Sequence, residues 1–221
     1  MNVFQKTALK DQAYDAIKKM ILFGELRPGQ LLNETELQDW IGIGRTPVRE
    51  ALLSLAHDML VVIHPRKGIE VATVSPKKIN EIFEIRLTME VSMLRAYMNR
   101  LDNEWLMELQ DAFHTLTLMA ITGKDTIRHI VEQDDRFHSG IIHASGNLMA
   151  ENIMSGFLDY LMLLRVTTTN SDETRHVASE REHIQIIQYI LSGDNDAACN
   201  ALREHLEISW KATLESYMQV G

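Results

Sequence analysis

The pattern of apolar and polar positions in the first 75 residues predicts three short helices followed by a β-hairpin. The segment 8–23 has its apolar residues at helical spacing and ends at Gly24, a natural helix stop. Asn33 is expected to cap a second helix, with Glu36 at the capping-box position. Residues 60–74 alternate on both sides of a Pro-Arg-Lys-Gly tip, which predicts a hairpin with a basic turn.

A third helix is predicted between the second helix and the hairpin. Thr46 is expected to cap it, and Pro47 to take its first position, where a missing N–H costs nothing. The apolar residues that follow recur every three or four positions and predict a buried face: Val48, Ala51, Leu52 and Leu55. Three helices and a basic-tipped hairpin in this order predict a winged helix-turn-helix, whose third helix enters the DNA major groove by its N-terminal end.

Basic residues lie where that motif would meet DNA. Arg45 and Arg49 are one helical turn apart and off the apolar face, and an Arg can grip a guanine edge through two hydrogen bonds. Thr46 can donate to a phosphate near the helix N-terminus, which attracts anions. Arg66 and Lys67 at the hairpin tip would reach an adjacent groove or the backbone. The alternative for each of these residues is a solvated surface charge or hydroxyl.

The chain from Ser75 onward has only helical patterns, beginning with Ser75 as a cap and Pro76 as the first helical residue. Six segments of about 20 residues are predicted to form an antiparallel bundle with a core or ligand site between helices. They are 76–99, 103–122, 125–145, 148–168, 174–192 and 195–218. We therefore expect a mainly α protein with a winged helix-turn-helix domain in residues 1–75 and an all-helical effector-binding and dimerisation domain in 76–221.

The charge distribution limits DNA binding to the first domain. Residues 1–75 hold nine Lys or Arg and nine Asp or Glu, so the whole net charge of −9 lies in residues 76–221. This negative charge would repel the phosphates of DNA. The single Cys199 fits a reducing compartment, and there is neither a secretory signal nor an apolar run long enough to span a membrane. A cytoplasmic protein is expected.

Four residues on apolar helix faces predict a metal site. Asp134 and His138 lie at i and i+4 on one helix, while His183 and His205 lie among apolar residues on two others. A carboxylate or imidazole buried alone needs a partner, and one divalent cation would satisfy all four. This set suits Zn²⁺, Mn²⁺, Ni²⁺ or Fe²⁺. The alternatives are a local Asp-His ion pair and histidines that are ordinary core residues.

Arg86 precedes Glu90 by one helical turn, so a surface ion pair is the simplest interpretation. If Arg86 faces the interior instead, it could clamp an anionic ligand.

The sequence also resembles a known family. The stretch "GELRPGQLLNETELQDWIGIGRTPVREALLSLAHDMLVVIHPRKGIEV" is similar to the DNA-binding domain of GntR-type transcriptional regulators, and "GRTPVREAL" is highly specific for them. The helical remainder resembles the FadR-type C-terminal domain, called FCD, through "DDRFHSGI", "EREHIQII" and "LREHLE". The resemblance implies that Asp134, His138, His183 and His205 bind a divalent transition metal, with Zn²⁺ first and Ni²⁺, Mn²⁺ or Fe²⁺ as alternatives. It also implies a homodimer that binds a two-fold operator in double-stranded DNA.

Two positions depart from the family pattern. Where many relatives carry Arg in the second helix, this chain has Thr35, so an expected DNA-contacting base is replaced by a hydroxyl. The hairpin tip keeps Gly68 but lacks the second glycine of the common form. Both positions are on the expected DNA-binding surface, so the operator preference is expected to differ.

The expected function is a metabolite-responsive regulator, in the repressor role, that changes its operator affinity on binding a small organic acid at the metal and Arg86. It is not expected to be an enzyme, although a three-His, one-Asp site could activate water. The other alternative is a regulator with a metal-free pocket for a larger ligand.

Overall fold

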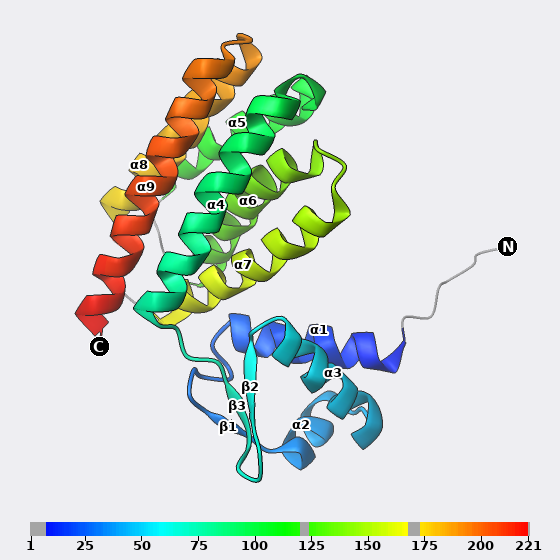
Figure 1. Ribbon diagram of the computed structural model, residues 1–221. Coiled ribbons are helices and arrows are strands. Elements are labelled where there is room, and N and C mark those ends of the chain that lie inside the picture. The colour runs from blue at the N-terminus through cyan, green and yellow to red at the C-terminus, as the bar shows by residue number, and fades with distance from the viewer. Residues whose placement is uncertain (1–7, 120–123, 168–172, 221) are drawn as a thin grey trace, which may run out of the picture. The chain divides into compact units, whose positions relative to one another are not determined.

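The structure is a computed structural model that describes residues 8–119, 124–167 and 173–220, and it gives no side-chain description for 124–128, 164–167, 173 and 219–220 (Figure 1). The predicted helix ends at 122 and 168 lie outside the described residues. The chain forms two compact units. One contains the described residues up to Val74 together with Asp159–Thr167, and the other contains the remaining described residues. Helical periodicity does not predict that Asp159–Thr167 groups with the first unit.

The first unit is a winged helix-turn-helix, as predicted. Its elements are α1 (Leu9–Leu22), β1 (Leu31–Leu32), α2 (Glu34–Ile41), α3 (Arg45–His57), β2 (Val61–His64) and β3 (Gly68–Val71). The strands form an antiparallel sheet in the order β1-β3-β2, and the register of the hairpin pairs His64 with Gly68. The predicted apolar face of α3 is fully buried. Burial of this face determines which side of α3 is exposed to solvent.

Helix α2 starts as predicted, whereas α3 starts two residues earlier. The Asn33 side chain accepts a hydrogen bond from the Thr35 backbone N–H at 3.0 Å and caps α2. The N-cap of α3 is Gly44 and not Thr46, so the prediction for Thr46 and Pro47 was wrong by this margin. Glycine at an N-cap leaves no side-chain signal in a sequence, and Pro47 is tolerated anywhere in the first turn because N–H groups there have no helical partner. Arg45 is therefore the first helical residue.

From Pro76 onward the described residues form the predicted bundle of six long helices, of which only Asp159–Thr167 groups with the first unit. They are α4 (Pro76–Tyr97), α5 (Asn103–Leu118), α6 (Lys124–His143), α7 (Leu148–Thr167), α8 (Glu173–Leu191) and α9 (Asn195–Val220), with a short 3₁₀ turn at Met98–Arg100. Ser75 caps α4 by accepting a hydrogen bond from the Lys78 backbone N–H, as predicted. Helix α4 packs on α6 and α9, and α5 packs on α6 and α8. The mainly α fold class is confirmed.

The core of the bundle lies between α4, α5, α6, α8 and α9. Phe113 and Phe137 are fully buried there, with their rings edge to face at 6.2 Å. Polar side chains from α6, α8 and α9 lie against this apolar wall, since the Phe113 ring stacks on the ring of His183 at 4.6 Å.

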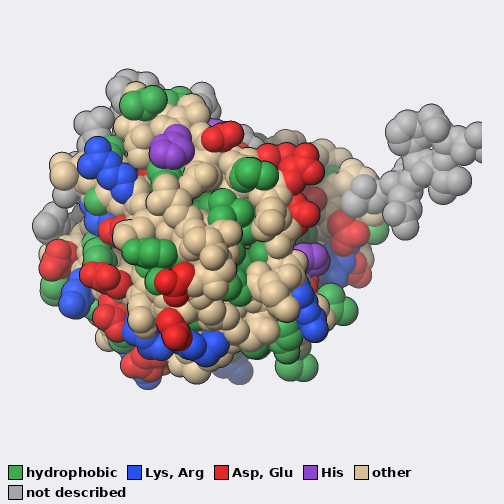
Figure 2. All heavy atoms as spheres, turned by 90° about the horizontal axis from the view of Figure 1, so that it is seen from above, with side chains coloured by type: hydrophobic (Ala, Val, Ile, Leu, Met, Phe, Trp, Pro, Cys, Tyr) green, Lys and Arg blue, Asp and Glu red, His purple; other side chains and the backbone are tan. Residues whose placement is uncertain are grey.

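The outer surface carries charges of both signs. Figure 2 shows one face on which acidic and basic side chains lie among apolar and uncharged ones. No helix within the described ranges is both long enough and apolar enough to cross a membrane.

Candidate functional site

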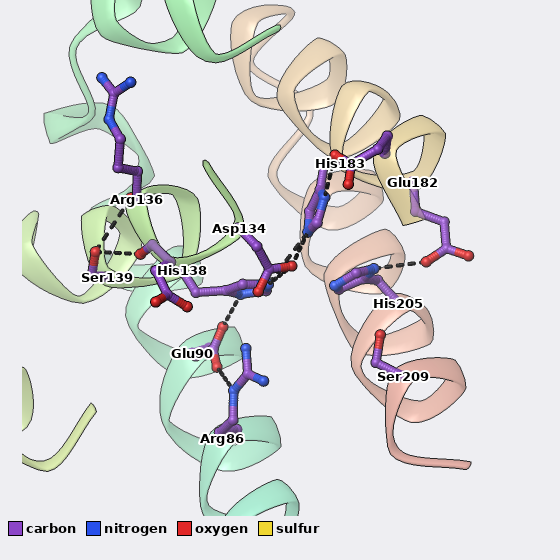
Figure 3. A network of polar contacts seen from close by, with 12 residues as sticks. Arg86, Glu90, Asp134, Arg136, His138, Ser139, Glu182, His183, His205 and Ser209 are labelled. Carbon is purple, nitrogen blue, oxygen red and sulfur yellow. Dashed lines mark hydrogen bonds and ion pairs between the residues drawn. The ribbon is translucent and has the colours of Figure 1, made fainter. Parts of the chain in front are cut away.

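Four buried side chains of the helical unit converge on one point. Asp134 and His138 from α6, His183 from α8 and His205 from α9 each place one potential ligand atom within 4.8 Å of the other three (Figure 3). All four are less than a tenth exposed. The residues predicted from their positions on apolar faces are therefore brought together.

The distances between these atoms are those of donors facing a common centre. Nε2 of His138 lies 3.4 Å from Nε2 of His183, and Oδ1 of Asp134 lies 3.9 Å and 3.6 Å from those two nitrogens. Two zinc-bound nitrogens in a tetrahedral site are about 3.4 Å apart, given Zn–N bonds of about 2.1 Å. The arrangement therefore fits a transition-metal ion.

A carboxylate faces the other ring nitrogen of each histidine. Nδ1 of His138 lies 2.6 Å from Oε2 of Glu90, and Nδ1 of His205 lies 2.7 Å from Oε2 of Glu182. Nδ1 of His183 is 3.7 Å from Oε2 of Glu180, which is longer than a hydrogen bond. A carboxylate can only accept, so the proton of His138 and of His205 sits on Nδ1 and the Nε2 lone pair faces the centre. Metal-binding histidines are commonly oriented in this way.

The pKa shifts keep the imidazoles of His138 and His205 neutral. Burial lowers the pKa of His138, outweighing the opposite effect of Glu90. Burial and the neighbouring His183 lower the pKa of His205 to about 3. Burial alone would raise the pKa of Glu90, but the charges of Arg86 and His138 and their hydrogen bonds bring it below its usual value. Neutral imidazoles and ionised carboxylates are the forms that bind metals.

The charges around the site favour a divalent ion. Four carboxylates and two guanidiniums surround the three imidazoles: Glu90, Asp134, Glu180, Glu182, Arg86 and Arg175. With all six ionised, two negative charges are left in a mostly buried group. One divalent cation balances them, and its ligands would be the converging Nε2 atoms and the Asp134 carboxylate.

Arg86 is buried, so the surface ion pair suggested by its spacing from Glu90 was wrong. Its Nε donates to Oε1 of Glu90 at 2.6 Å, and the Arg86 and Glu90 side chains are 3% and 0% exposed. The pair connects Arg86 to His138 through the Glu90 carboxylate (Figure 3). Nη2 of Arg86 is buried and has no hydrogen-bond partner among the described residues. An unpaired guanidinium N–H in the interior is costly, and an anionic ligand would satisfy it.

Arg175 supports the opposite side of the site. It donates to both carboxylate oxygens of Glu182, at 2.8 Å and 3.0 Å, and to Oγ of Ser209 at 3.0 Å. These bonds hold Glu182 against His205 and tie α8 to α9.

Sequence reasoning missed the three glutamates behind the histidines. Glu180 and Glu182 precede His183 in "SEREHIQ", but acidic residues on helices are mostly solvated, so their burial could not be predicted from the sequence. Glu90 was noticed only as the partner of Arg86. The clearest sign that Glu90 is buried was that Arg86 and Glu90 occur on the same helix as a series of inward-facing apolar residues.

The DNA-binding candidates lie at two places on the first unit, the start of α2 and α3 and the tip of the hairpin. Arg45, Thr46 and Arg49 are at the start of α3, and the Arg45 and Arg49 side chains are 70% and 58% exposed. Thr35 in the first turn of α2 is also exposed, as are Arg66 and Lys67 at the tip between β2 and β3. Arg66 has a positive φ of 67°, in the left-handed region that glycine favours.

Two family models match the chain and together cover both units. The model for bacterial regulatory proteins of the gntR family matches residues 9–71, and the FCD domain model matches residues 81–208. This chain belongs to the GntR family, in the branch with an FCD domain. GntR proteins of this kind are transcription regulators and not enzymes, with a helix-turn-helix DNA-binding domain and an FCD effector-binding domain.

HTH-type transcriptional regulators from other bacteria resemble the chain over most of their length. The chain is 28% identical over 194 residues to the HTH-type transcriptional regulator YdhC of Bacillus subtilis, which covers 88% of this chain and 86% of YdhC. It is 32% identical over 197 residues to an HTH-type transcriptional regulator in an unstable DNA locus of Streptomyces ambofaciens, covering 87% and 80% of the two chains.

Solved structures have the same fold. McbR/YncC of E. coli is 20% identical, with a TM-score of 0.80 over 96% of this chain and 99% of that chain. The Zn²⁺-bound FCD domain of TM0439 is 28% identical, with a TM-score of 0.54 over 66% of this chain and 98% of that chain.

Proposed function

We propose that this GntR protein is a cytoplasmic homodimeric repressor whose FCD domain binds one divalent metal per chain, with Zn²⁺ as the first candidate and Ni²⁺, Mn²⁺ or Fe²⁺ as alternatives. A small carboxylate effector binds at that metal and alters operator affinity. The observation that carries the proposal is the convergence of three imidazole Nε2 atoms and one carboxylate inside an apolar bundle. The Zn²⁺-bound FCD domain of TM0439 supports zinc as the metal.

The ligands are Asp134, His138, His183 and His205. These four residues would hold the ion, which would supply a Lewis-acidic centre that attracts a carboxylate. The carboxylates on Nδ1 fix the rings of His138 and His205 with their lone pairs inward. No step of the function requires a reaction at the metal.

Arg86 supplies the second attachment point for the effector. Its Nη2 has no hydrogen-bond partner among the described residues, while its Nε is held by Glu90. A carboxylate bound by both the metal and Arg86 would be recognised by charge at two points, which favours small acids over neutral metabolites.

Operator binding uses Arg45, Thr46 and Arg49 of α3, Thr35 of α2, and the hairpin-tip bases Arg66 and Lys67. The effector changes operator affinity only by its differential affinity for the DNA-competent and released states, and a coupling of about 1–3 kcal/mol is typical. Loss of operator binding on effector addition is the expected direction for a repressor.

The test of the metal site is metal analysis of the purified protein beside a His183→Ala variant. We expect about one divalent ion per chain in the wild type, its loss in the variant, and unchanged helical content by circular dichroism. His114, which is exposed on α5, provides the matched control His114→Ala. Absence of metal from the wild type after incubation with Zn²⁺, Mn²⁺ or Ni²⁺ would count against the site and favour a metal-free pocket for a larger ligand.

The test of the DNA-binding surface is an Arg49→Ala variant, measured on duplexes that the wild type selects from a random-sequence pool. We expect operator binding to be lost while metal content is unchanged. Normal operator affinity in the variant would refute the role of Arg49.

A further inference from the structure

An acidic residue lies between the two arginines that the proposed DNA-binding surface depends on. Oε2 of Glu34, at the start of α2, is 3.2 Å from Nε of Arg49 and 3.9 Å from Nε of Arg45. One carboxylate oxygen therefore faces both guanidiniums. Neither arginine has another acidic partner within ion-pair distance among the described residues.

The position of Glu34 is fixed by its own helix. Asn33 caps α2 through the Thr35 backbone N–H, and the Asn33 side chain also donates to Glu36 at 3.1 Å. The Gln38 side chain donates to the Glu34 carbonyl at 2.9 Å. The Glu34 side chain is 27% exposed, so it is much less free to move than the arginines it contacts.

The ion pairs contribute little to folding. Both arginine side chains are more than half exposed, and solvent-exposed pairs of this kind add little to the stability of a protein. An acid on a surface that meets phosphates also opposes DNA binding through repulsion. Neither folding nor general DNA affinity accounts for a carboxylate at this place.

The contact atoms suggest what the carboxylate does. Glu34 meets each arginine at Nε, the nitrogen nearest the aliphatic stem. The two terminal nitrogens of a guanidinium form the fork that binds O6 and N7 of guanine. An ion pair at Nε leaves the two terminal nitrogens available for a base edge. It also restricts the side-chain torsions that set the orientation of the guanidinium.

We propose that Glu34 is a specificity-determining residue that positions Arg49, and to a smaller degree Arg45, for reading base edges. This inference rests on the proposed role of α3 in operator binding. Glu34 acts through the arginines and requires no contact with DNA. Without it, the arginines still attract phosphates but sample more orientations, so the operator loses affinity relative to random DNA.

The experiment compares wild type with Glu34→Gln, which keeps the size of the side chain and removes its charge. Binding to a duplex selected by the wild type and to a random-sequence duplex of equal length is measured by fluorescence anisotropy at one fixed salt concentration. We expect the ratio of the two affinities to fall by about tenfold, the lower part of the range for one bidentate base contact. Random-duplex affinity should stay equal or rise, because a repelling charge is removed.

Asp39→Asn provides the matched control, since Asp39 is an exposed acid on the same helix. It makes the same charge change and should leave the affinity ratio unchanged. Glu34→Gln should have a much smaller effect on the ratio in an Arg49→Ala background, which is the signature of action mainly through Arg49. Thermal unfolding of each variant shows whether the fold is retained.

Two results would overturn the inference. An unchanged ratio in Glu34→Gln, or equal gains for both duplexes, would reduce Glu34 to a general repelling charge. If Arg49→Ala binds the selected duplex as well as the wild type does, the proposed role of α3 fails first and that of Glu34 fails with it. The two failures are distinguishable. If only the role of Glu34 fails, Arg49→Ala still binds the selected duplex poorly.

Discussion

Nδ1 of His205 and Oε2 of Glu182 lie 2.7 Å apart, and Arg175 holds both oxygens of that carboxylate from the other side. The bond fixes the proton of His205 on Nδ1 and directs Nε2 to the centre of the candidate metal site. Glu182 therefore orients the candidate ligand His205 without being a candidate ligand itself.

Glu182→Gln should weaken metal binding without abolishing it. The amide oxygen can still accept from Nδ1, but the negative charge that raises the basicity of His205 is lost. Removal of such partners typically costs about 10- to 100-fold in metal affinity. Competition with a chromogenic chelator measures the change. Glu204→Gln, an exposed acid next to His205 in sequence, is the control and should bind metal normally. Equal affinities in the two variants would contradict the role of Glu182.

The metal-free protein should lose stability as the pH falls from 6.5 toward 5. The pKa of His205 is about 3 in the folded state, compared with about 6.5 for an unperturbed histidine. Between these values the unfolded chain binds one more proton at this residue, so acid favours unfolding. This contribution is complete above pH 6.5 and is lost at about 1.4 kcal/mol per pH unit near pH 5. Burial lowers the pKa of His138 as well, which adds to the slope in the same direction.

Urea unfolding of chelator-treated protein at several pH values measures this slope. His205→Gln removes one of the titrating groups and should give a shallower dependence on pH than the wild type. Identical slopes would mean that His205 is protonated equally in the folded and unfolded states. The range from pH 5 to 6.5 is the informative one, because most carboxylates remain ionised there.

Gly140→Ala should destabilise the helical unit. A Cβ at Gly140 of α6 would overlap the ring of Trp105 on α5, so the two helices would have to separate or the ring would have to move. Overpacking of this kind costs about 1–3 kcal/mol. The same helix carries Asp134 and His138, so metal affinity should fall together with the thermal midpoint. Gly156→Ala on α7 has no neighbour within 4 Å of the added carbon and is the control, with no comparable loss of stability.

Arg66→Gly and Arg66→Ala should differ in their effect on stability and have the same effect on DNA binding. Arg66 has a φ of 67°, which costs a residue with a Cβ about 1 kcal/mol and costs glycine almost nothing. Arg66→Gly should raise the thermal midpoint, whereas Arg66→Ala should leave it near the wild-type value. Both should reduce the slope of log affinity against log salt by about one, as expected for one lost phosphate contact. An unchanged salt slope in both variants would exclude a phosphate contact.

Helical periodicity was sufficient to predict the helices of both units because their buried positions repeat at helical intervals. The apolar face of α3 and the caps at Asn33 and Ser75 were found in this way. The start of α3 was misplaced because Gly44 caps the helix without a side chain. Trp40 shows a second limit. It has helical spacing with Leu37 but is 56% exposed, since a helix of eight residues buries a narrow stripe.

The ligand candidates were predictable for a different reason. Asp134, His138, His183 and His205 are polar residues at positions where the periodic pattern requires burial. The residues that orient them follow no such rule, because Glu90, Glu180 and Glu182 become buried only through the way the helices pack together. The contact of Glu34 with two arginines likewise depends on how α2 packs on α3.

The candidate ligands extend from residue 134 to residue 205, and the last of them lies on the final helix of the chain. During synthesis from the ribosome, a chain that ends before α9 lacks His205 and offers three of the four ligands. A chain interrupted at that point would hold metal more weakly than the finished protein. Full metal affinity at this site would then require α9 to be packed against the other helices of the bundle.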